Sequence, residues 1–286
     1  MNNINKKSPD KQEFTQRMCD IAKVPKSLWY TGKLPKNAPS VAIVGSRKPT
    51  EYGRHVTQKL ASQLAARGVI IVSGLALGHD GLAHRGALDG GGITIAVLGS
   101  GLNELTPRTN RGLAEEILKR DGAIISEYEP DLPVHAGSHL ERNRLISALA
   151  DVVVVVEAGF RSGTLNTAMH ALEQGRELMA VPGNITSPLS VGCNKLIAQG
   201  ATPVTSTDDV LEKLGLVSIA ENDGDLPLFN NDAERLVVDL IKSGMSDGEQ
   251  IIAELGQTVS EFNRTITNLE IAGIVRPLGA NRWMLK

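Results

Sequence analysis

The stretch VAIVGSR, residues 41–47, decides the fold, because four apolar residues are followed at once by glycine, serine and arginine. An uninterrupted apolar run of this kind is typical of a strand buried on both faces of a parallel sheet. Glycine after the strand permits a tight turn, and a helix that follows offers free N–H groups at its start. The stretch therefore predicts a strand, an anion-binding turn and a helix.

The same arrangement occurs twice more along the chain. Residues 69–72 run into 73–78, which contain Ser73, Gly74 and Gly78, and residues 152–156 run into 157–164, which contain Arg161, Ser162, Gly163 and Thr164. The carboxyl ends of parallel strands open at one edge of a sheet. Three such turns predict one long crevice that binds an extended phosphorylated ligand.

The alternation of apolar runs and amphipathic stretches predicts the fold class. The runs are 41–44, 69–72, 93–97, 123–125, 152–156 and 178–181, with a weaker one at 202–204; the amphipathic stretches include 52–67, 110–120, 140–150, 162–174 and 207–214. Gly68 directly follows the amphipathic stretch 52–67, and a glycine at this place predicts the end of a helix. We therefore expect an α/β protein with an extended Rossmann-like, doubly wound and mostly parallel sheet.

The pattern changes at both ends of this region. Residues 1–39 are polar and dotted with proline, and we expect a short lead-in segment with one small helix before a Rossmann-like domain at 40–215. Residues 216–231 are acidic and rich in turn formers, which predicts a linker. Three short amphipathic stretches and two extended pieces in 232–286 predict a small winged-helix-like domain.

Composition excludes several classes of protein. The 286 residues carry a net charge of −2, 41% hydrophobic and 3% aromatic residues, so a local basic groove is possible but extensive base stacking is not expected. No apolar run approaches the roughly 20 residues that span a bilayer, and the N-terminus lacks the apolar core of a secretory signal. The two cysteines are far apart without metal-ligand spacing, which favours a reduced cytoplasmic setting with no metal site.

Cationic side chains border the predicted crevice. Arg142, Asn143 and Arg144 begin the helix that precedes the strand at 152–156, where positive charge, donors and the helix dipole coincide. The other candidate phosphate contacts are Ser46, Arg47, Arg161 and Lys195. Each of these alone could be an ordinary exposed residue, but five cations exceed what a mononucleotide needs and suit a polyanion.

Other chemistry receives less support. The dinucleotide fingerprint and the phosphate-binding loop of ATPases are both missing, so no cofactor is expected. Asp80 and His84 would share one helix face and could act as an acid–base pair or as metal ligands. We favour a structural interpretation, in which Asp80 caps the helix and His84 makes one hydrogen bond, because no third ligand is evident nearby.

Together these residues resemble the DprA/Smf family of DNA-processing proteins, over roughly residues 25–215. The resemblance lies in the order and spacing of several blocks: Ile43 to Arg47, Val72 to Ala76 with Gly78, Asp80 and His84, Val97 to Leu102, Ile125 to Glu127, Arg142 to Ile146, Val155 to Ala158, Ser162 to Leu165, Val181 to Gly183 and Gly192 to Ala201. The C-terminal region is also similar to the accessory domain of the family.

The resemblance implies a binding protein and not an enzyme. It would bind single-stranded DNA without sequence specificity, act as a homodimer, and load RecA recombinase onto incoming DNA during natural transformation. The family's DNA pocket carries over onto Gly45, Ser46, Arg47, Arg142, Asn143, Arg144, Ser162, Gly163 and Lys195. One departure concerns stacking, because His139 and Leu140 stand where the family usually has Phe-Pro.

Two other functions stay open. A Lonely Guy-like nucleotide phosphoribohydrolase has a similar sheet, but the glutamates expected after its Gly-Thr turn are replaced by Leu165 and Asn166. A sensor of small nucleotides, with the C-terminal domain as effector, is also compatible with the sequence. The stretch 260–272 has one cation and two acids, so we expect that domain to contact protein rather than duplex DNA.

Overall fold

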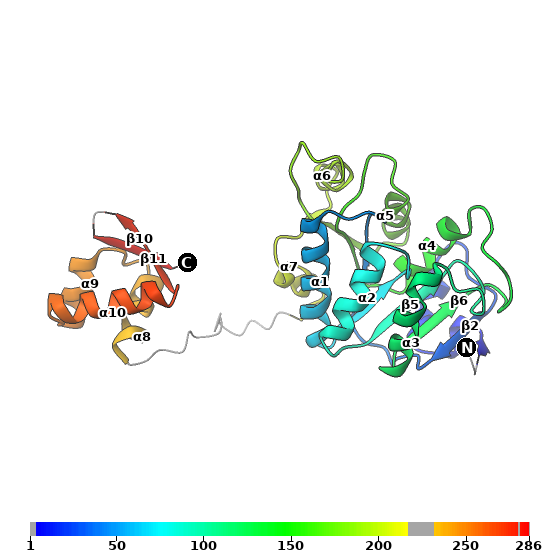
Figure 1. Cartoon of the computed structure of the whole chain (residues 1–286), viewed down its shortest axis with the longest axis horizontal. Coiled ribbons are helices and arrows are strands. Elements are labelled where there is room, and N and C mark those ends of the chain that lie inside the picture. Colours follow the sequence, from blue (N-terminus) through cyan, green and yellow to red (C-terminus); the bar gives the residue numbers. More distant parts are fainter. Residues whose placement is uncertain (1–3, 217–231, 280, 286) are drawn as a thin grey trace. The chain divides into compact units, whose positions relative to one another are not determined.

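The computed structural model describes residues 4–216, 232–279 and 281–285. The chain divides into two compact units, Met1–Ser218 and Ile219–Lys286, which are described separately (Figure 1). All but the first residue of the predicted linker, 216–231, lies outside the described residues. No helix in the described ranges is long and apolar enough to cross a membrane.

A nine-stranded sheet forms the centre of the larger unit, in the order β1-β2-β6-β5-β4-β3-β7-β8-β9. The strands are β1 (Asn5–Lys7), β2 (Leu28–Gly32), β3 (Ser40–Val44), β4 (Ile70–Ser73), β5 (Thr94–Leu98), β6 (Ala123–Ser126), β7 (Val152–Val155), β8 (Glu177–Ala180) and β9 (Thr202–Pro203). Strands β3 to β9 all pair in parallel, whereas β1 and β2 are antiparallel additions at one edge. The mostly parallel sheet predicted from the sequence is confirmed.

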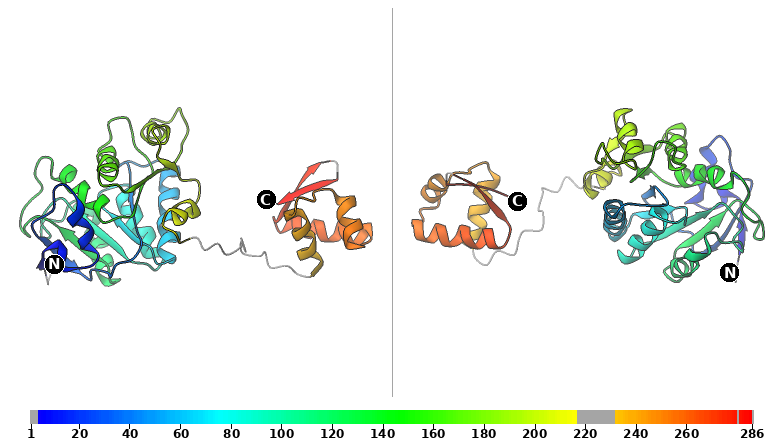
Figure 2. Two further views of the ribbon diagram at one scale, coloured as in Figure 1. Left: turned by 180° about the vertical axis from the view of Figure 1, so that it is seen from behind. Right: turned by 45° about the horizontal axis from the view of Figure 1, so that its top comes forward.

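Helices cover both faces of this sheet (Figure 2). One face carries α1 (Glu51–Ala66), α2 (His79–Asp89), α3 (Arg111–Lys119) and α7 (Thr207–Lys213); the other carries α4 (Ser138–Ala148), α5 (Thr164–Glu173), α6 (Val191–Ala198) and the 3-10 helix η2 (Thr15–Asp20). Two further 3-10 turns are η1 (Pro9–Lys11) and η3 (Arg108–Asn110). Along β3, Ala42 and Val44 pack against one layer, and Val41 and Ile43 against the other. Continuous apolar strands are the consequence of burial on two sides.

The N-terminal segment is more integrated than the sequence predicted. Residues 28–32 form β2, which pairs antiparallel with β6, and β1 pairs with β2. Phe14 and Met18 are fully buried in the layer that holds α4 and α5. The expected lead-in with one small helix is therefore corrected: it contributes two strands and part of the core, because an aromatic, β-forming run at 28–31 covers the edge of β6.

The smaller unit consists of three helices and a hairpin. These are α8 (Asp232–Lys242), α9 (Gly248–Leu255), α10 (Val259–Ile271), β10 (Val275–Gly279) and β11 (Arg282–Leu285). Phe262 and Leu269 on α10 are fully buried with Val237 and Ile251 from the other two helices. Thr258 and Glu261 form a reciprocal cap at the start of α10. The elements are those predicted, with boundaries shifted by one or two residues.

The strand order reverses at β3 and β7, and this reversal positions the functional site. From β3 the chain proceeds through α1 to β4 on one side, whereas from β7 it proceeds through α5 to β8 on the other. The connections after these two neighbouring strands diverge, which leaves a crevice at their carboxyl ends.

Candidate functional site

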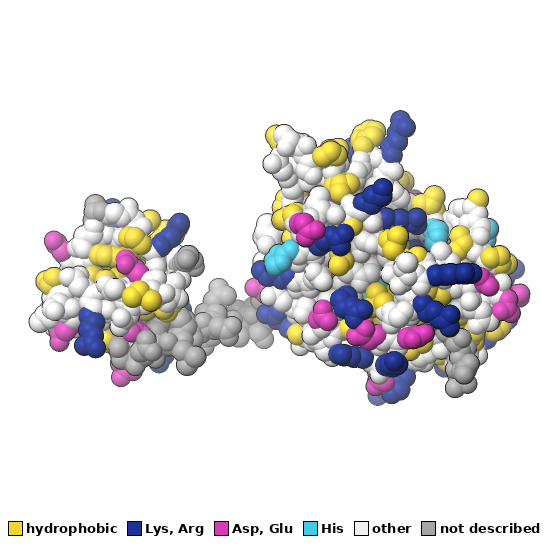
Figure 3. Space-filling model, in the orientation of Figure 1, with side chains coloured by type: hydrophobic (Ala, Val, Ile, Leu, Met, Phe, Trp, Pro, Cys, Tyr) yellow, Lys and Arg dark blue, Asp and Glu magenta, His cyan; other side chains and the backbone are white. Residues whose placement is uncertain are grey.

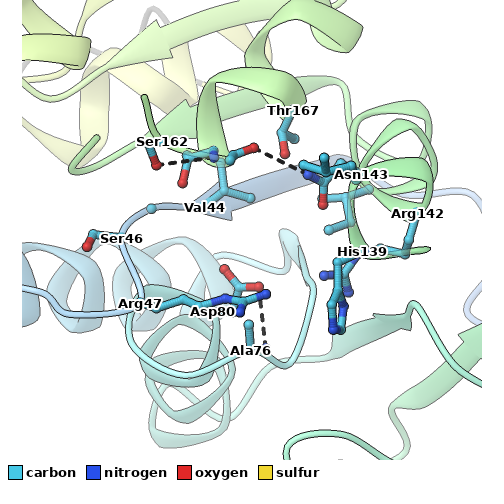
Figure 4. A pocket seen from close by; sticks show the side chains of 15 residues that line it. Val44, Ser46, Arg47, Ala76, Asp80, His139, Arg142, Asn143, Ser162 and Thr167 are labelled. Atoms are coloured by element: carbon cyan, nitrogen blue, oxygen red, sulfur yellow. Dashed lines mark hydrogen bonds between the residues drawn. The ribbon is translucent and has the colours of Figure 1, made fainter. Parts of the chain in front are cut away.

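A pocket of about 350 Å³ lies at this reversal, beyond the carboxyl ends of β3 and β7 (Figure 4). It is lined by Val44, Gly45, Ser46, Arg47, Ala76, Asp80, His139, Leu140, Arg142, Asn143, Ile146, Ser162, Gly163, Thr164 and Thr167. Four segments contribute: the β3–α1 loop, the start of α2, the start of α4 and the β7–α5 loop. The three turns predicted to form one crevice are thus brought together, with α4 as the fourth wall.

The β3–α1 loop is held in place by Glu157, which is buried just after β7. The Ser46 N–H donates to the Glu157 backbone carbonyl at 2.9 Å. The Glu157 carboxylate accepts from the Thr50 N–H at 2.9 Å and from the Thr50 hydroxyl at 2.5 Å. Thr50 also caps α1 by accepting from the Gly53 N–H. These bonds fix the backbone that carries Ser46 and Arg47 along the pocket.

His79 completes this buried network. Its Nε2 lies 3.1 Å from the Glu157 carboxylate, and its Nδ1 lies 2.6 Å from the Thr57 hydroxyl. Burial lowers the pKa of His79, and the Thr57 hydroxyl beside its ring also donates to the Gly53 carbonyl at 2.8 Å. A Cβ at Gly45 would collide with the His79 ring. Gly45 is therefore required for this packing as well as for the turn.

Arg47 is the exposed cation of the pocket. Its side chain extends across the opening toward Asp80 and Ala76 (Figure 4). Among the described residues it has no ion-pair partner and no side-chain hydrogen bond. Its guanidinium group is thus exposed to solvent beside the pocket, where the sequence placed it.

Arg142 has a different role, because it is only 3% exposed. Its Nη1 donates to the backbone carbonyls of Gly74, at 2.7 Å, and of Val97. Burial lowers the pKa of Arg142 to about 10, while the nearby Asp80 carboxylate opposes that shift, so Arg142 stays charged at neutral pH. A Cβ at Gly74 would collide with the guanidinium group. Arg142 therefore ties α4 to the ends of β4 and β5.

Two nitrogens of Arg142, Nε and Nη2, make no hydrogen bond within the described part of the chain. The Nε–H is buried as well. An unsatisfied buried donor is costly, and such a group in a pocket wall is a candidate for bonding a ligand oxygen. The predicted phosphate clamp at Arg142 is reduced to these donors, because Nη1 is already bonded to two backbone carbonyls.

Arg144 does not reach the pocket, which corrects the prediction for this residue. It is 6% exposed and makes a two-pronged ion pair with Glu127, with both N–O distances at 2.6 Å. Its Nε donates to the carbonyl of Lys23 at 3.1 Å. Residues two positions apart on a helix point in different directions, so Arg142 and Arg144 could not both face the crevice.

Uncharged donors form the opposite rim, as expected. Ser162 and Gly163 lie immediately before α5, and Thr164 is its first residue. The Ser162 oxygen accepts from the Thr164 N–H at 3.2 Å, which leaves the hydroxyl hydrogen available. Asn143 donates weakly to the Gly163 carbonyl at 3.4 Å and lines the same wall. The start of α5 adds its positive dipole end to these donors.

Arg161 and Lys195 lie outside the residues that line the pocket, so the five cations do not surround one cavity. Both side chains are exposed. Lys195, on α6, places its Nζ 5.7 Å from the centre of the Phe160 ring. These two cations extend the basic surface beyond the pocket instead of lining it.

Asp80 and His139 line the pocket although the predicted site did not include them. The prediction that Asp80 caps α2 is wrong, because no side-chain bond caps this helix. The Asp80 carboxylate instead accepts a long bond from the Ala76 N–H at 3.4 Å, and burial raises the pKa of Asp80. Burial together with Arg142 and Arg47 lowers the pKa of His139, which keeps its ring neutral. The sequence signal for Asp80 was its place in the first turn of the helix that follows the glycine-containing turn 73–78.

The prediction that His84 makes one structural hydrogen bond is confirmed. His84 is fully buried, and its Nδ1 lies 2.7 Å from the Thr94 hydroxyl. No group of three or more metal-ligating side chains occurs within the described ranges.

Basic side chains are prominent among the charged groups on one part of the larger unit. In Figure 3 the charged side chains on its upper part are mostly Lys and Arg, among many apolar ones, whereas acidic side chains are more frequent below. A local field of this kind attracts anions even when the net charge of the chain is −2.

Fold and pocket together define a doubly wound α/β protein with a pocket rich in hydrogen-bond donors at the reversal of its strand order. The sequence model of the family described as DNA recombination-mediator protein A matches residues 7–215, and the chain belongs to this family. The predicted resemblance is thereby confirmed.

Relatives and solved structures support the same assignment. The chain is 38% identical to protein Smf of Escherichia coli K12, over 92% of this chain and 73% of the relative. It is 42% identical to DNA processing protein DprA of Streptococcus pneumoniae, over 68% of each chain. The crystal structure of the S. pneumoniae protein aligns with a TM-score of 0.67, at 37% identity over 74% of each chain.

A second solved structure comes from Helicobacter pylori, and its description concerns the single-stranded DNA binding mode of DNA processing protein A. It aligns with a TM-score of 0.63, at 34% identity, and covers 70% of this chain and 91% of that one.

Proposed function

We propose that this protein binds single-stranded DNA without sequence specificity and without changing it chemically. The observation that carries the proposal is an unpaired arginine, Arg47, beside a pocket whose opposite rim presents the Ser162 hydroxyl and the start of α5. The relative from H. pylori, described as a single-stranded DNA-binding protein, supports it. Base-independent binding follows because the donors suit phosphate oxygens more than base edges.

The charges in the pocket assign different tasks to its residues. Asp80 lies close enough to Arg142 to oppose the shift of its pKa, and burial raises the pKa of Asp80 itself. Arg47 then supplies the uncompensated positive charge, with Ser162 and the first N–H groups of α5 as neutral donors. The Arg142 Nε–H offers one further bond to an oxygen that enters the pocket.

The family suggests the biological setting. We propose that the protein acts in the cytoplasm as a homodimer, protects incoming DNA, and loads RecA recombinase onto it during natural transformation and recombination. The description of the family as a recombination mediator supports this proposal. RecA filament formation on DNA coated with single-strand-binding protein, with and without this chain, tests it directly.

Arg47→Ala tests the DNA-binding proposal. Removal of the unpaired guanidinium should weaken binding to an oligo-dT strand at least tenfold and should lower the slope of log affinity against log salt by about 0.7. Titrations by fluorescence anisotropy at several salt concentrations measure both quantities.

The matched control is Arg67→Ala, which removes an exposed arginine that precedes β4 at the opposite edge of the sheet. Equal affinities for the two variants would contradict the assignment of the pocket. Competition with mononucleotides separates DNA binding from a nucleotide sensor, since about 350 Å³ accommodates roughly one nucleotide. Free adenine after incubation with AMP would instead indicate a phosphoribohydrolase.

A further inference from the structure

Phe160 is exposed in a way that the fold does not require. Its side chain is 67% exposed, whereas Phe14 and Phe262 are fully buried. It lies in the β7–α5 loop, two residues before Ser162. In Figure 3, apolar side chains lie on the upper surface of the larger unit, around the loops before α5 and α6. Scattered apolar residues on a surface are common, so exposure alone carries little weight.

The backbone around Phe160 is nevertheless well fixed. The Ala158 N–H donates to the Leu189 carbonyl at 2.8 Å, and the Ser162 N–H donates to the Gly159 carbonyl at 3.1 Å. The Gly192 N–H, at the start of α6, donates to the Ala158 carbonyl at 2.8 Å. The ring is therefore presented to solvent by a loop whose backbone is bonded on both sides of it.

Cations border the ring. The Lys195 Nζ lies 5.7 Å from the ring centre, which is within the range of a cation–π contact. Arg161 is the next residue in the chain, and no ion-pair partner for it occurs in the described part of the chain. An apolar ring between two available cations favours a polyanion with flat apolar groups over an uncharged protein surface.

The ring is also close to the proposed DNA pocket. Ser162 of the pocket rim follows Phe160 by two positions, a span of at most about 7 Å along the chain. A strand whose phosphate is held at Ser162 and Arg47 can therefore reach Phe160 with a neighbouring nucleotide.

We propose that Phe160 is a stacking platform for one base of a bound single strand, with Lys195 and Arg161 holding the phosphates that flank that base. This inference rests on the proposed function and adds to it a contact outside the pocket. Every base has a flat π face, so such a contact strengthens binding without reading sequence. It also gives a role to Lys195 and Arg161, which do not line the pocket.

Phe160→Ala is the test, with Leu172→Ala as the control, because Leu172 is 61% exposed on α5 of the same unit. Each variant is titrated with oligo-dT and with a strand of equal length whose residues lack bases. Phe160→Ala should weaken binding to oligo-dT roughly tenfold, as expected for the loss of one stacked base, and leave binding to the abasic strand unchanged. Leu172→Ala should match the wild type on both strands.

Phe160→Trp provides an independent signal. Its affinity should match the wild type, and its additional fluorescence should be quenched by oligo-dT but not by the abasic strand. Wild-type affinity of Phe160→Ala for oligo-dT would overturn the stacking contact alone and would favour a protein partner for this residue. If the wild type fails to bind oligo-dT, both the stacking contact and the proposed function are wrong.

Discussion

Three arginines of this protein differ in their surroundings although the sequence presents them alike. Arg47 is exposed and unpaired among the described residues, Arg142 is buried against backbone carbonyls, and Arg144 is buried against Glu127. Arg47 can meet a ligand with its whole guanidinium group, whereas Arg142 can offer only the donors that its bonds to the backbone leave unused. The electric field at the pocket therefore depends on which arginine side chains already have a partner in the protein.

His84 predicts a pH dependence of stability. Its folded-state pKa is lowered to about 3 by burial, against about 6.5 in the unfolded chain. Below pH 6.5 the unfolded state therefore binds one proton more than the folded state, and the free energy of unfolding decreases as the pH is lowered. Between pH 7 and pH 5 this single group should lower the free energy of unfolding by about 2 kcal/mol.

The comparison of wild type with His84→Gln checks this expectation. Urea unfolding at pH 5, 6 and 7, followed by Trp29 fluorescence in a Trp283→Phe background, gives the slope for each protein. The variant should be less stable at pH 7 but should lose about 2 kcal/mol less on acidification. The control His55→Gln removes an exposed imidazole. Identical pH slopes for His84→Gln and the wild type would contradict the prediction.

Residue types at strand ends identified the pocket, but not the orientation of each side chain. The sequence predicted Gly45, Ser46, Arg47, Asn143, Ser162, Gly163 and Thr164, all of which line it. It could not show that Arg144 is paired with Glu127, because that contact joins α4 to the segment after β6. Nor could it show that Asp80 faces the pocket instead of capping α2.

At the scale of elements, α4 depends on one internal anchor. Arg142 connects its first turns to the carbonyls of Gly74 and Val97, at the ends of β4 and β5. The guanidinium group thereby joins a helix to the ends of two neighbouring strands of the sheet. Loss of the anchor affects the wall of the pocket before it affects any contact with DNA.

Arg142→Met should therefore destabilise the larger unit by about 3 kcal/mol, because it leaves the buried carbonyls of Gly74 and Val97 without their donor. Thermal or urea unfolding measures the loss. A loss of DNA binding in this variant could come from unfolding as well as from a lost DNA contact. For the same reason a double variant with Arg47→Ala and Arg142→Ala does not test DNA binding by the pocket separately from folding.

Arg47→Ala serves as the control for stability, because an exposed unpaired arginine contributes little to folding. Equal unfolding free energies for Arg142→Met and Arg47→Ala would show that Arg142 is not an anchor.

Strong periodicity made most elements predictable. The six apolar runs correspond to β3 to β8, and the stretch at 52–67 corresponds to α1 with a shift of one residue. Strand β2 was missed because its residues do not form a continuous apolar run, and its pairing with β6 depends on contacts far apart in the sequence. The local sequence pattern predicts helices and buried strands well, but it does not show which strands far apart in the sequence pair with each other.

At the scale of the whole molecule, the pocket belongs entirely to the first unit. All of its lining residues lie between 44 and 167, and the second unit contains its own apolar core. On α10, Glu261 and Glu270 outnumber the single cation Arg264, which does not favour contact with a phosphate backbone.

A chain that ends at residue 216 should fold and should bind oligo-dT within about threefold of the full-length affinity, because the pocket is complete without the second unit. Circular dichroism and anisotropy titrations measure these two properties. Residues 232–286 expressed alone should bind neither oligo-dT nor duplex DNA. A tenfold or larger loss of affinity on truncation would assign a direct DNA contact to the second unit.

The antiparallel pairing of β2 with β6 has a consequence for synthesis on the ribosome. Residues 28–32 emerge before their partner at 123–126 has been translated. The side chains of Phe14 and Met18 likewise stay uncovered until α4, which is translated later still, has emerged. Nascent chains therefore expose apolar side chains during elongation, and this interval is when a chaperone would engage them.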